Sequence, residues 1–255
     1  MTALLGTRGL TVEIAGKTVC RDFNFSLPAG SITGILGPNG VGKTTLLHTL
    51  AGVRAPQDGN IQIAGKSLTS WPRRLLARQL GLLLQDRIDP FPATVLETAL
   101  IGRHPHMDFW RWESHEDVKQ ARKALKIVHL DGLEQRPQNQ LSGGERRRLA
   151  LATLLTQAPD IYLLDEPTNH LDLQHQLSIL THFAQLTREH NKAVLLTLHD
   201  INLIARYCDS VMLLYGDGVI HQGPTETVLT EDNLSRLYGT PVVRIQQNGH
   251  TAFLA

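Results

Sequence analysis

A glycine-rich segment that ends in a lysine carries the most specific chemistry in this 255-residue sequence. Residues 37–44 read GPNGVGKT and fill every fixed position of the phosphate-binding pattern G-x-x-x-x-G-K-[ST]. Glycines let successive backbone N–H groups turn inward as a nest for an anion. Lys43 is expected to reach the β- and γ-phosphates of a nucleotide, and Thr44 to offer its hydroxyl to Mg²⁺. The expected nucleotide contacts here are Gly37, Asn39, Gly40, Gly42, Lys43, Thr44 and Thr45.

The residues on either side of this loop have the patterns of a strand and a helix. Residues 31–36 (SITGIL) are mostly apolar and rich in β-formers, as in a buried strand. Residues 44–51 place leucines at helical spacing, and Gly52 can stop a helix. The loop is therefore predicted to lead into a helix N-terminus, whose partial positive charge favours a phosphate. The alternative is an ordinary glycine-rich turn.

Two adjacent carboxylates close a second apolar strand. Residues 161–164 (IYLL) form a continuous apolar run, typical of a parallel strand buried on both faces, and Asp165 and Glu166 follow it. Burying two like charges is costly unless a cation offsets them. A metal–phosphate site would do so, with Asp165 holding Mg²⁺ and Glu166 orienting or activating a water. The alternative is a strand end with two solvent-exposed acids.

These segments, together with three others, resemble the ATP-binding subunit of an ATP-binding-cassette transporter. Residues 141–145 (LSGGE) are similar to that family's LSGGQ signature, with Glu145 where glutamine is more usual. Residues 169–172 (NHLD) match its D-loop. Gln85 matches its glutamine loop and His199 its switch histidine, each after an apolar run. The order and spacing of the motifs agree across nearly the whole chain.

The resemblance implies a head-to-tail homodimer with two ATP molecules between one subunit's phosphate loop and the other's signature. It implies that Ser142, Gly143 and Gly144 contact the partner's ATP. It also implies catalytic roles for Glu166, His199 and Gln85, with Gln85 sensing Mg²⁺ beside Thr44 and Asp165. Taken physically, residues 142–152 predict a helix capped by Ser142, whose exposed backbone donors suit a phosphate. The alternative for residues 142–152 is a routine capped helix. The alternative for His199 and Gln85 is a purely structural role.

One position departs from the family's pattern. An aromatic side chain that stacks on adenine is expected about thirty residues before the lysine, and the spacing places Ile14 there. An isoleucine can cover a purine by apolar contact, but it offers no π-face. Phe23 and Phe25 alternate in a predicted strand and are expected in the core.

Composition and charge exclude other classes of function. The formal net charge of +1 leaves no basic footprint for nucleic acid, and Arg146, Arg147 and Arg148 are expected on a solvated or interface helix face. Cys20 and Cys208 form no ligand or disulfide pattern, which suits a reducing cytosol. No apolar run approaches the ~18 residues of a membrane helix, and residues 1–10 lack a signal-peptide layout. With no membrane helix expected in this chain, the resemblance implies a peripheral protein on the cytoplasmic face of the inner or plasma membrane.

The predicted fold class is α/β: a P-loop NTPase core with a mostly parallel sheet, an N-terminal antiparallel β subdomain and an inserted helical lobe. We expect one domain over residues 1–255, with residues 1–85 and 159–255 as the nucleotide-binding core. Residues 86–158 would form the lobe that carries the signature and docks on a membrane subunit. Trp110 and Trp112 are either docking anchors or ordinary packing of this lobe.

The weaker motifs bear on the transported substrate. Residues 96–106 (LETALIGRHPH) and 237–241 (LYGTP) resemble the subgroup that serves iron-chelate, haem and cobalamin importers. The expected function is an ATPase that powers a bacterial importer for an iron-siderophore or cobalamin, with haem or another substrate as the alternative. Polytopic permease subunits and an extracytoplasmic binding protein are the expected partners. A soluble non-transport ATPase of the same superfamily remains the alternative from another class.

Overall fold

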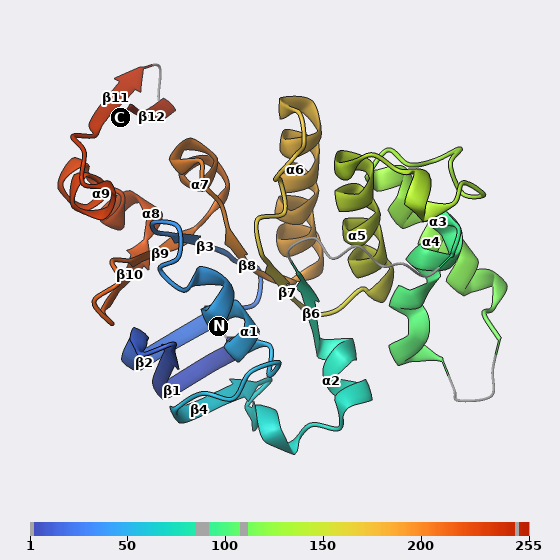
Figure 1. Ribbon diagram of the computed structural model, residues 1–255, viewed down its shortest axis with the longest axis horizontal. Helices are drawn as coiled ribbons and strands as arrows, with labels where there is room; N and C mark the ends of the chain where they lie inside the picture. Colours follow the sequence, from blue (N-terminus) through green and yellow to red (C-terminus); the bar gives the residue numbers. More distant parts are fainter. Residues whose placement is uncertain (1–2, 85–91, 108–111, 248–249, 255) are drawn as a thin grey trace.

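The computed structural model describes residues 3–84, 92–107, 112–247 and 250–254. A six-stranded sheet in the order β10-β9-β3-β8-β7-β6 forms its centre (Figure 1). The five strands from β9 to β6 are parallel, and β10 pairs with β9 in the antiparallel sense. The strands are β3 (Ile32–Leu36), β6 (Leu80–Leu83), β7 (Ile161–Leu164), β8 (Ala193–Thr197), β9 (Ser210–Leu214) and β10 (Ile220–Pro224). This arrangement confirms the predicted mostly parallel sheet.

A second, antiparallel sheet is built from the N-terminal part of the chain, as predicted. Its order is β2-β1-β4-β5, and the long strands β1 and β2 form a hairpin. Its strands are β1 (Ala3–Ile14), β2 (Lys17–Pro28), β4 (Asp58–Ile63) and β5 (Lys66–Ser67). Phe23 is buried and stacks on the half-buried Phe25 with ring centroids 5.9 Å apart. The two rings thus serve packing, as expected.

The parallel strands are mostly apolar because both of their faces are covered. Ile35, Leu163 and Leu195 point into the core that the strands share with α1 (Lys43–Leu50) and the N-terminal sheet. Their neighbours Leu36, Leu164 and Leu196 point into a second core, which contains the remaining large helices. Because side chains alternate along a strand, each strand serves both cores.

Helices α3 (Val95–Leu100), α4 (His115–Ile127) and α5 (Gly143–Gln157) pack against one another at one end of the sheet (Figure 1). Each begins with a capping box, in which a hydroxyl accepts from the backbone N–H three residues on and a carboxylate returns the contact. The boundaries of a separate lobe at 86 and 158 stay a prediction. Trp110 lies outside the described residues, and the side chain of Trp112 is 89% exposed. Ordinary packing of Trp112 within the chain is therefore wrong.

The remaining helices complete the layers around the sheet. They are α2 (Arg73–Gln79), α6 (Leu173–His190), α7 (Ile201–Tyr207), α8 (Thr225–Val228) and α9 (Glu231–Tyr238), with the 3₁₀ turns η1 (Leu68–Ser70), η2 (Ile101–His106) and η3 (Gln138–Gln140). A final hairpin, β11 (Val243–Gln247) and β12 (His250–Leu254), ends the chain beyond α9 (Figure 1). In the part of the chain that the structure describes, no helix has the length and apolar character needed to span a bilayer.

Candidate functional site

The glycine-rich loop joins β3 to α1, as the sequence predicted, and it is held between two other segments. Gly42 precedes α1 with φ 109°, and a Cβ there would lie 2.5 Å from a methyl group of Val19 in β2. A Cβ on Gly37 would lie 2.7 Å from the carbonyl oxygen of Leu214 at the end of β9. Side chains larger than hydrogen would push the loop out of this space. Val19 therefore shapes the loop, although nothing in its type marked it in the sequence.

Lys43 is buried and turned back over its own loop. Its Nζ donates to the carbonyl oxygens of Gly37 at 2.7 Å and Pro38 at 3.1 Å, and its side chain retains 6% exposure. Burial lowers the pKa of the ammonium, while the charges of Glu166 and Asp165 act against that shift. The cation thus lies in the field of both carboxylates, although more than a hundred residues separate them in the sequence. Asn39 and Gly40 are exposed, and Thr44 and Thr45 are half-buried.

Asp165 is fully buried at the end of β7, so the solvent-exposed alternative is wrong for this residue. Its Oδ1 accepts a hydrogen bond from the hydroxyl of Thr197 at 2.9 Å. Its Oδ2 has no hydrogen-bond partner among the described residues. A buried carboxylate oxygen without a donor fits a hard cation such as Mg²⁺. Since no group of three or more His, Cys, Asp or Glu side chains in the described ranges could hold a metal, such an ion would also need water and phosphate oxygens.

Thr197 is a polar residue at this site that the sequence reasoning did not single out. Besides donating to Asp165, its hydroxyl accepts from the backbone N–H of Glu166 at 2.8 Å. The residue lies in β8, next to β7 in the sheet, and it is fully buried. A lone hydroxyl in the apolar run 193–198 was the available signal, because a buried hydroxyl needs hydrogen-bond partners.

Glu166 and His199 lie at the carboxyl ends of two adjacent strands and contact each other directly. His199 Nε2 is 2.7 Å from Glu166 Oε1, and Asn169 Nδ2 donates to Glu166 Oε2. The backbone of Glu166 has φ 49°, a left-handed conformation that a residue other than glycine keeps only when the surrounding structure imposes it. The Glu166 side chain is 11% exposed and that of His199 is 47% exposed, so the pair opens toward solvent. A water bound there would find a carboxylate acceptor and an imidazole together.

Arg147 corrects one sequence expectation. The arginine cluster at 146–148 was predicted to form a solvated or interface face, but Arg147 retains only 2% exposure. Its guanidinium donates to the carbonyl oxygen of Leu84 at 2.6 Å, and to those of Asp165 and Glu166. The flanking arginines also donate to backbone carbonyls, Arg146 to Leu141 and Arg148 to Val128 and His129. A guanidinium has five donors and can satisfy several carbonyls that would otherwise be unpaired.

The segment 141–145 (hereafter the signature segment) starts α5 with the cap that the sequence predicted. Ser142 Oγ accepts from the amide of Glu145 at 3.2 Å, and Glu145 Oε2 accepts from the amide of Ser142 at 2.7 Å. The latter contact is the main reason why the pKa of Glu145 lies below its ordinary value. Ser142 and Gly143 are exposed. A Cβ on Gly144 would lie 2.9 Å from the carbonyl oxygen of His170, so this glycine allows a close backbone approach.

The structure does not bring the signature segment onto the chain's own phosphate loop. Figure 1 shows α1 beside the N-terminal sheet, whereas α5 lies on the other side of α6. Helices α1 and α5 also contribute to different hydrophobic cores. Ile14 is 37% exposed and ends β1 at the turn of the β1–β2 hairpin, whose second strand contacts the loop through Val19. Gln85 lies outside the described residues, and its predicted role stays a prediction.

Known proteins and structures resemble this chain over most of its length. The family model described as ABC transporter matches residues 20–169. The ferric enterobactin transport ATP-binding protein FepC of Escherichia coli (strain K12) is 36% identical over 90% of this chain and 85% of its own. The hemin import ATP-binding protein HmuV of Escherichia coli O157:H7 is 35% identical over 94% of this chain and 93% of its own.

Solved structures of ABC transporter proteins also have the fold of this chain. A chain of a proposed metal-chelate type ABC transporter, in an inward-facing conformation, superposes with a TM-score of 0.84 at 28% identity, over 99% of this chain and 98% of that chain. The dimeric structure of the bacterial ABC transporter cassette MJ0796 gives a TM-score of 0.76 at 26% identity, over 87% of this chain and 98% of that one. The matched family, the sequence relatives and the fold agree with the motifs of this sequence: the chain belongs to the ABC transporter family, among its ATP-binding subunits.

Proposed function

We propose that this chain is the ATP-hydrolysing subunit of a bacterial importer and that it works as a homodimer on the cytoplasmic face of the membrane. The observation that supports this most is the convergence of Lys43, Asp165, Glu166 and His199 at one end of the parallel sheet. A buried ammonium in the field of two carboxylates, above a glycine-rich nest, is suited to a metal-bound triphosphate. A second phosphate-binding surface, the signature segment, lies elsewhere on the same chain.

Each residue of the loop has a defined part in this proposal. Lys43 would exchange the carbonyl oxygens of Gly37 and Pro38 for the β- and γ-phosphates of ATP, because its ammonium already lies over the loop. Asp165, through its unpartnered Oδ2, and Thr44, through its hydroxyl, would hold Mg²⁺, together with Gln85. When bound, Mg²⁺ neutralises charge on the transferred phosphoryl group. Gly37, Asn39, Gly40, Gly42 and Thr45 would contact the nucleotide by their backbone or hydroxyl groups.

The Glu166–His199 pair would position the attacking water. The carboxylate of Glu166 would accept a hydrogen bond from that water. Asn169 would hold the Glu166 side chain in place, and Thr197 would hold its backbone N–H. His199, which is half-exposed, would swing between Glu166 and the γ-phosphate. In a head-to-tail dimer, Ser142, Gly143 and Gly144 would supply donors to the γ-phosphate held by the partner's loop.

The relatives suggest the class of transported substrate. The two named above are a ferric enterobactin transport and a hemin import ATP-binding protein, and a cobalamin import ATP-binding protein BtuD of Halobacterium salinarum is 35% identical over 93% of this chain and 59% of its own. We propose a metal chelate, an iron-siderophore or cobalamin ahead of haem, carried by polytopic permease subunits and delivered by an extracytoplasmic binding protein.

Three measurements test the proposal. The purified chain should hydrolyse ATP and lose this activity when EDTA removes Mg²⁺. Nucleotide binding should be weaker in Lys43→Ala, which deletes the charge facing the phosphates. Affinity purification from membranes should recover a polytopic membrane protein with it. Hydrolysis without any such partner would favour a soluble non-transport ATPase of the same superfamily instead.

A further inference from the structure

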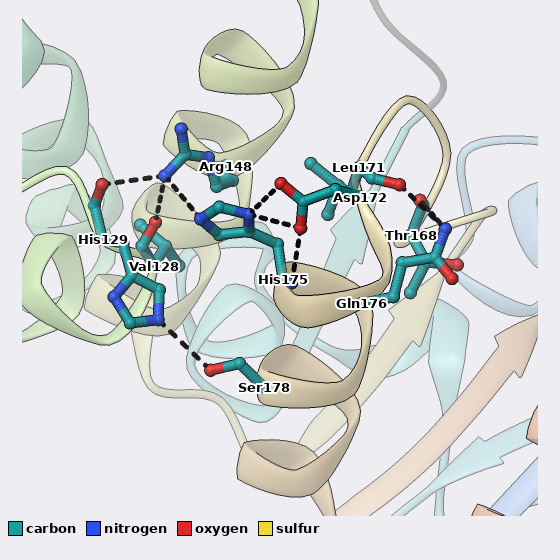
Figure 2. Close-up of polar contacts among 9 residues, drawn as sticks. All are labelled: Val128, His129, Arg148, Thr168, Leu171, Asp172, His175, Gln176 and Ser178. Atoms are coloured by element: carbon teal, nitrogen blue, oxygen red, sulfur yellow. Dashed lines mark hydrogen bonds and ion pairs between the residues drawn. The ribbon is translucent and has the colours of Figure 1, made fainter.

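The first turn of α6 carries a polar cluster that lies outside the phosphate loop and joins three segments (Figure 2). His175 lies between Asp172, the N-cap of α6, and Arg148 of α5. Ring atom Nδ1 is 2.7 Å from Asp172 Oδ1, and ring atom Nε2 is 3.3 Å from Nη1 of Arg148. The imidazole therefore bridges the D-loop, residues 169–172, and the helix that begins at the signature segment.

The partners of the ring define its hydrogen positions. A guanidinium can only donate, so Nε2 of His175 must accept from Arg148. An ionised carboxylate can only accept, so Nδ1 must carry the hydrogen that is donated to Asp172. The neutral Nδ1–H form of the ring fits both contacts at once. The hydrogen bonds thus link the Asp172 carboxylate, the His175 imidazole and the Arg148 guanidinium in series, and each contact polarises the next.

Arg148 extends this bridge to α4. The same Nη1 donates to the carbonyl oxygens of Val128 at 3.1 Å and His129 at 2.8 Å, at the end of that helix. A cation at a helix C-terminus is favoured because the last carbonyls lack partners within the helix. Arg148 thus connects α5 with the end of α4 and the start of α6, and His175 is its side-chain contact on α6 (Figure 2).

Two neighbours fix the ring of His175 and the segment beside it. The ring of His129 packs edge-on against it, with centroids 5.3 Å apart, and His129 Nε2 is 3.4 Å from Ser178 Oγ on α6. The next residue, Gln176, donates through Nε2 to the carbonyl oxygen of Leu171 at 2.9 Å (Figure 2). One turn of α6 therefore contacts both the D-loop and, through Arg148, the signature helix.

The D-loop and the signature segment also meet directly. Gly144 packs so closely on the carbonyl oxygen of His170 that a Cβ would lie 2.9 Å from it. At its other end, the D-loop reaches the Glu166 carboxylate through Asn169. A small shift of α5 would therefore change both the exposed donors of the signature segment and the D-loop that contacts Glu166.

We infer that His175 is a positioning residue, which acts through Arg148 to hold the signature segment in register with the D-loop. The inference rests on the proposed function, because the signature segment is there assigned to the partner's ATP. Of the two contacts, the one to Arg148 carries the effect. The Asp172 side chain is 65% exposed, so water screens its bond to the ring, and its cap to the His175 amide at 2.9 Å needs no imidazole.

Two amide substitutions of His175 distinguish the contact with Arg148 from the contact with Asp172. In His175→Gln, the terminal amide oxygen lies near the position of Nε2 and can accept from Arg148. In His175→Asn, the shorter amide lies near Nδ1 and can donate to Asp172 but cannot reach Arg148. His175→Leu fills space without either contact, and His190→Asn is a control at the exposed end of the same helix.

We expect kcat/KM for ATP to fall roughly three- to tenfold in the His175→Asn and His175→Leu variants. The Gln and control variants should stay within about twofold of the wild type.

A second measurement needs no catalysis. Hydrogen exchange in the nucleotide-free protein should be faster across residues 141–148 in the Asn and Leu variants, and unchanged in the Gln and control variants. If the Gln and Asn variants exchange alike, His175 has no positioning role, whatever their activity. An inactive wild type would contradict the proposed function, while the exchange pattern would still decide the role of His175.

Discussion

The guanidinium of Arg147 donates to the carbonyl oxygen of Glu166 at 2.8 Å, which ties α5 to the backbone that carries the catalytic candidate. Two further donations, to Leu84 and Asp165, hold the ends of β6 and β7 to the same helix. Because the signature segment opens α5, one buried side chain connects that segment with the strand ends that carry Asp165 and Glu166. The position of each thus depends on the other.

Arg147→Met should destabilise the fold by about 2–4 kcal/mol, because it removes the hydrogen bonds that the buried guanidinium donates to the carbonyl oxygens of Leu84, Asp165 and Glu166. Thermal unfolding monitored by circular dichroism would measure the loss. Arg146→Met is the matched control, since that side chain is exposed and, among the described residues, donates to the carbonyl oxygen of Leu141 alone, so its loss should stay below about 1 kcal/mol. Equal losses in the two variants would show that the buried contacts of Arg147 contribute nothing.

Glu166→Gln should retain ATP binding and slow hydrolysis by about 10²-fold or more, the scale for removing a general base. The amide preserves the shape of the carboxylate but cannot take up the proton of a water. ATP should then accumulate a dimer, because closure outlasts turnover, and size-exclusion chromatography with and without ATP would detect it. Turnover near that of the wild type would remove Glu166 from this role.

Mixing Lys43→Ala with Ser142→Arg should restore part of the ATPase activity if each site is shared by two subunits. Each homodimer has two damaged sites, whereas the heterodimer has one intact site, provided that one site suffices for turnover. The measurement is the steady-state rate across mixing ratios, with each variant alone as control. ATP-dependent dimers of Glu166→Gln that persist undiminished after adding Ser142→Arg would count strongly against the shared site.

Ile14→Tyr should tighten ATP binding and change the maximal rate little. Stacking on an aromatic face contributes ~1–3 kcal/mol per base, and Ile14 is 37% exposed, so an aromatic ring at this position has room. Because Ile14 has no such face, affinity should come mainly from the phosphate contacts, which do not distinguish bases. GTP should therefore support hydrolysis by the unaltered chain within about tenfold of ATP, a gap of about 1.4 kcal/mol. Titration with both nucleotides would test this. A preference for ATP above about a hundredfold would show that another group holds the base.

Asp117→Asn should lower the free energy of unfolding at neutral pH by about 1 kcal/mol. It should also make the free energy of unfolding fall less steeply as the solution becomes acidic. The Ser114 hydroxyl, followed by Arg103, holds the pKa of Asp117 at about 2. Because this folded pKa lies below the ordinary ~3.9, the stabilisation is fully present above about pH 4 and is lost as the pH falls toward 2. Chemical denaturation between pH 2 and 7 would show it.

Glu116→Gln is the control for this prediction, since that carboxylate is exposed on the same turn, accepts from the uncharged Gln120 side chain at 2.7 Å and has only a long contact with Lys119, at 3.9 Å. Its variant should follow the acid dependence of the wild type. An unaltered acid dependence in Asp117→Asn would mean that the contacts with Ser114 and Arg103 exist equally in the unfolded chain.

The features that the sequence alone determined are those that depend on neighbouring residues. The nest of residues 37–44, the cap of Ser142 on Glu145 and the buried run before Asp165 all follow from backbone freedom, short hydrogen bonds and side-chain alternation within one element. Such rules act over a few positions, so a sequence expresses them without a fold. The mostly parallel sheet followed from the same local patterns and their order along the chain.

The tertiary structure alone decided which distant groups share an environment. Arg147 was expected with its neighbours on a solvated or interface helix face, but it is buried, where it donates to the carbonyl oxygens at the ends of β6 and β7. Thr197 met Asp165 only when β8 came beside β7, and His175 met Arg148 only when α6 came beside α5. Periodicity indicates which face of an element is buried but not what lies against it. Hydrogen bonds across the core are therefore set by the packing of whole elements, which no local pattern records.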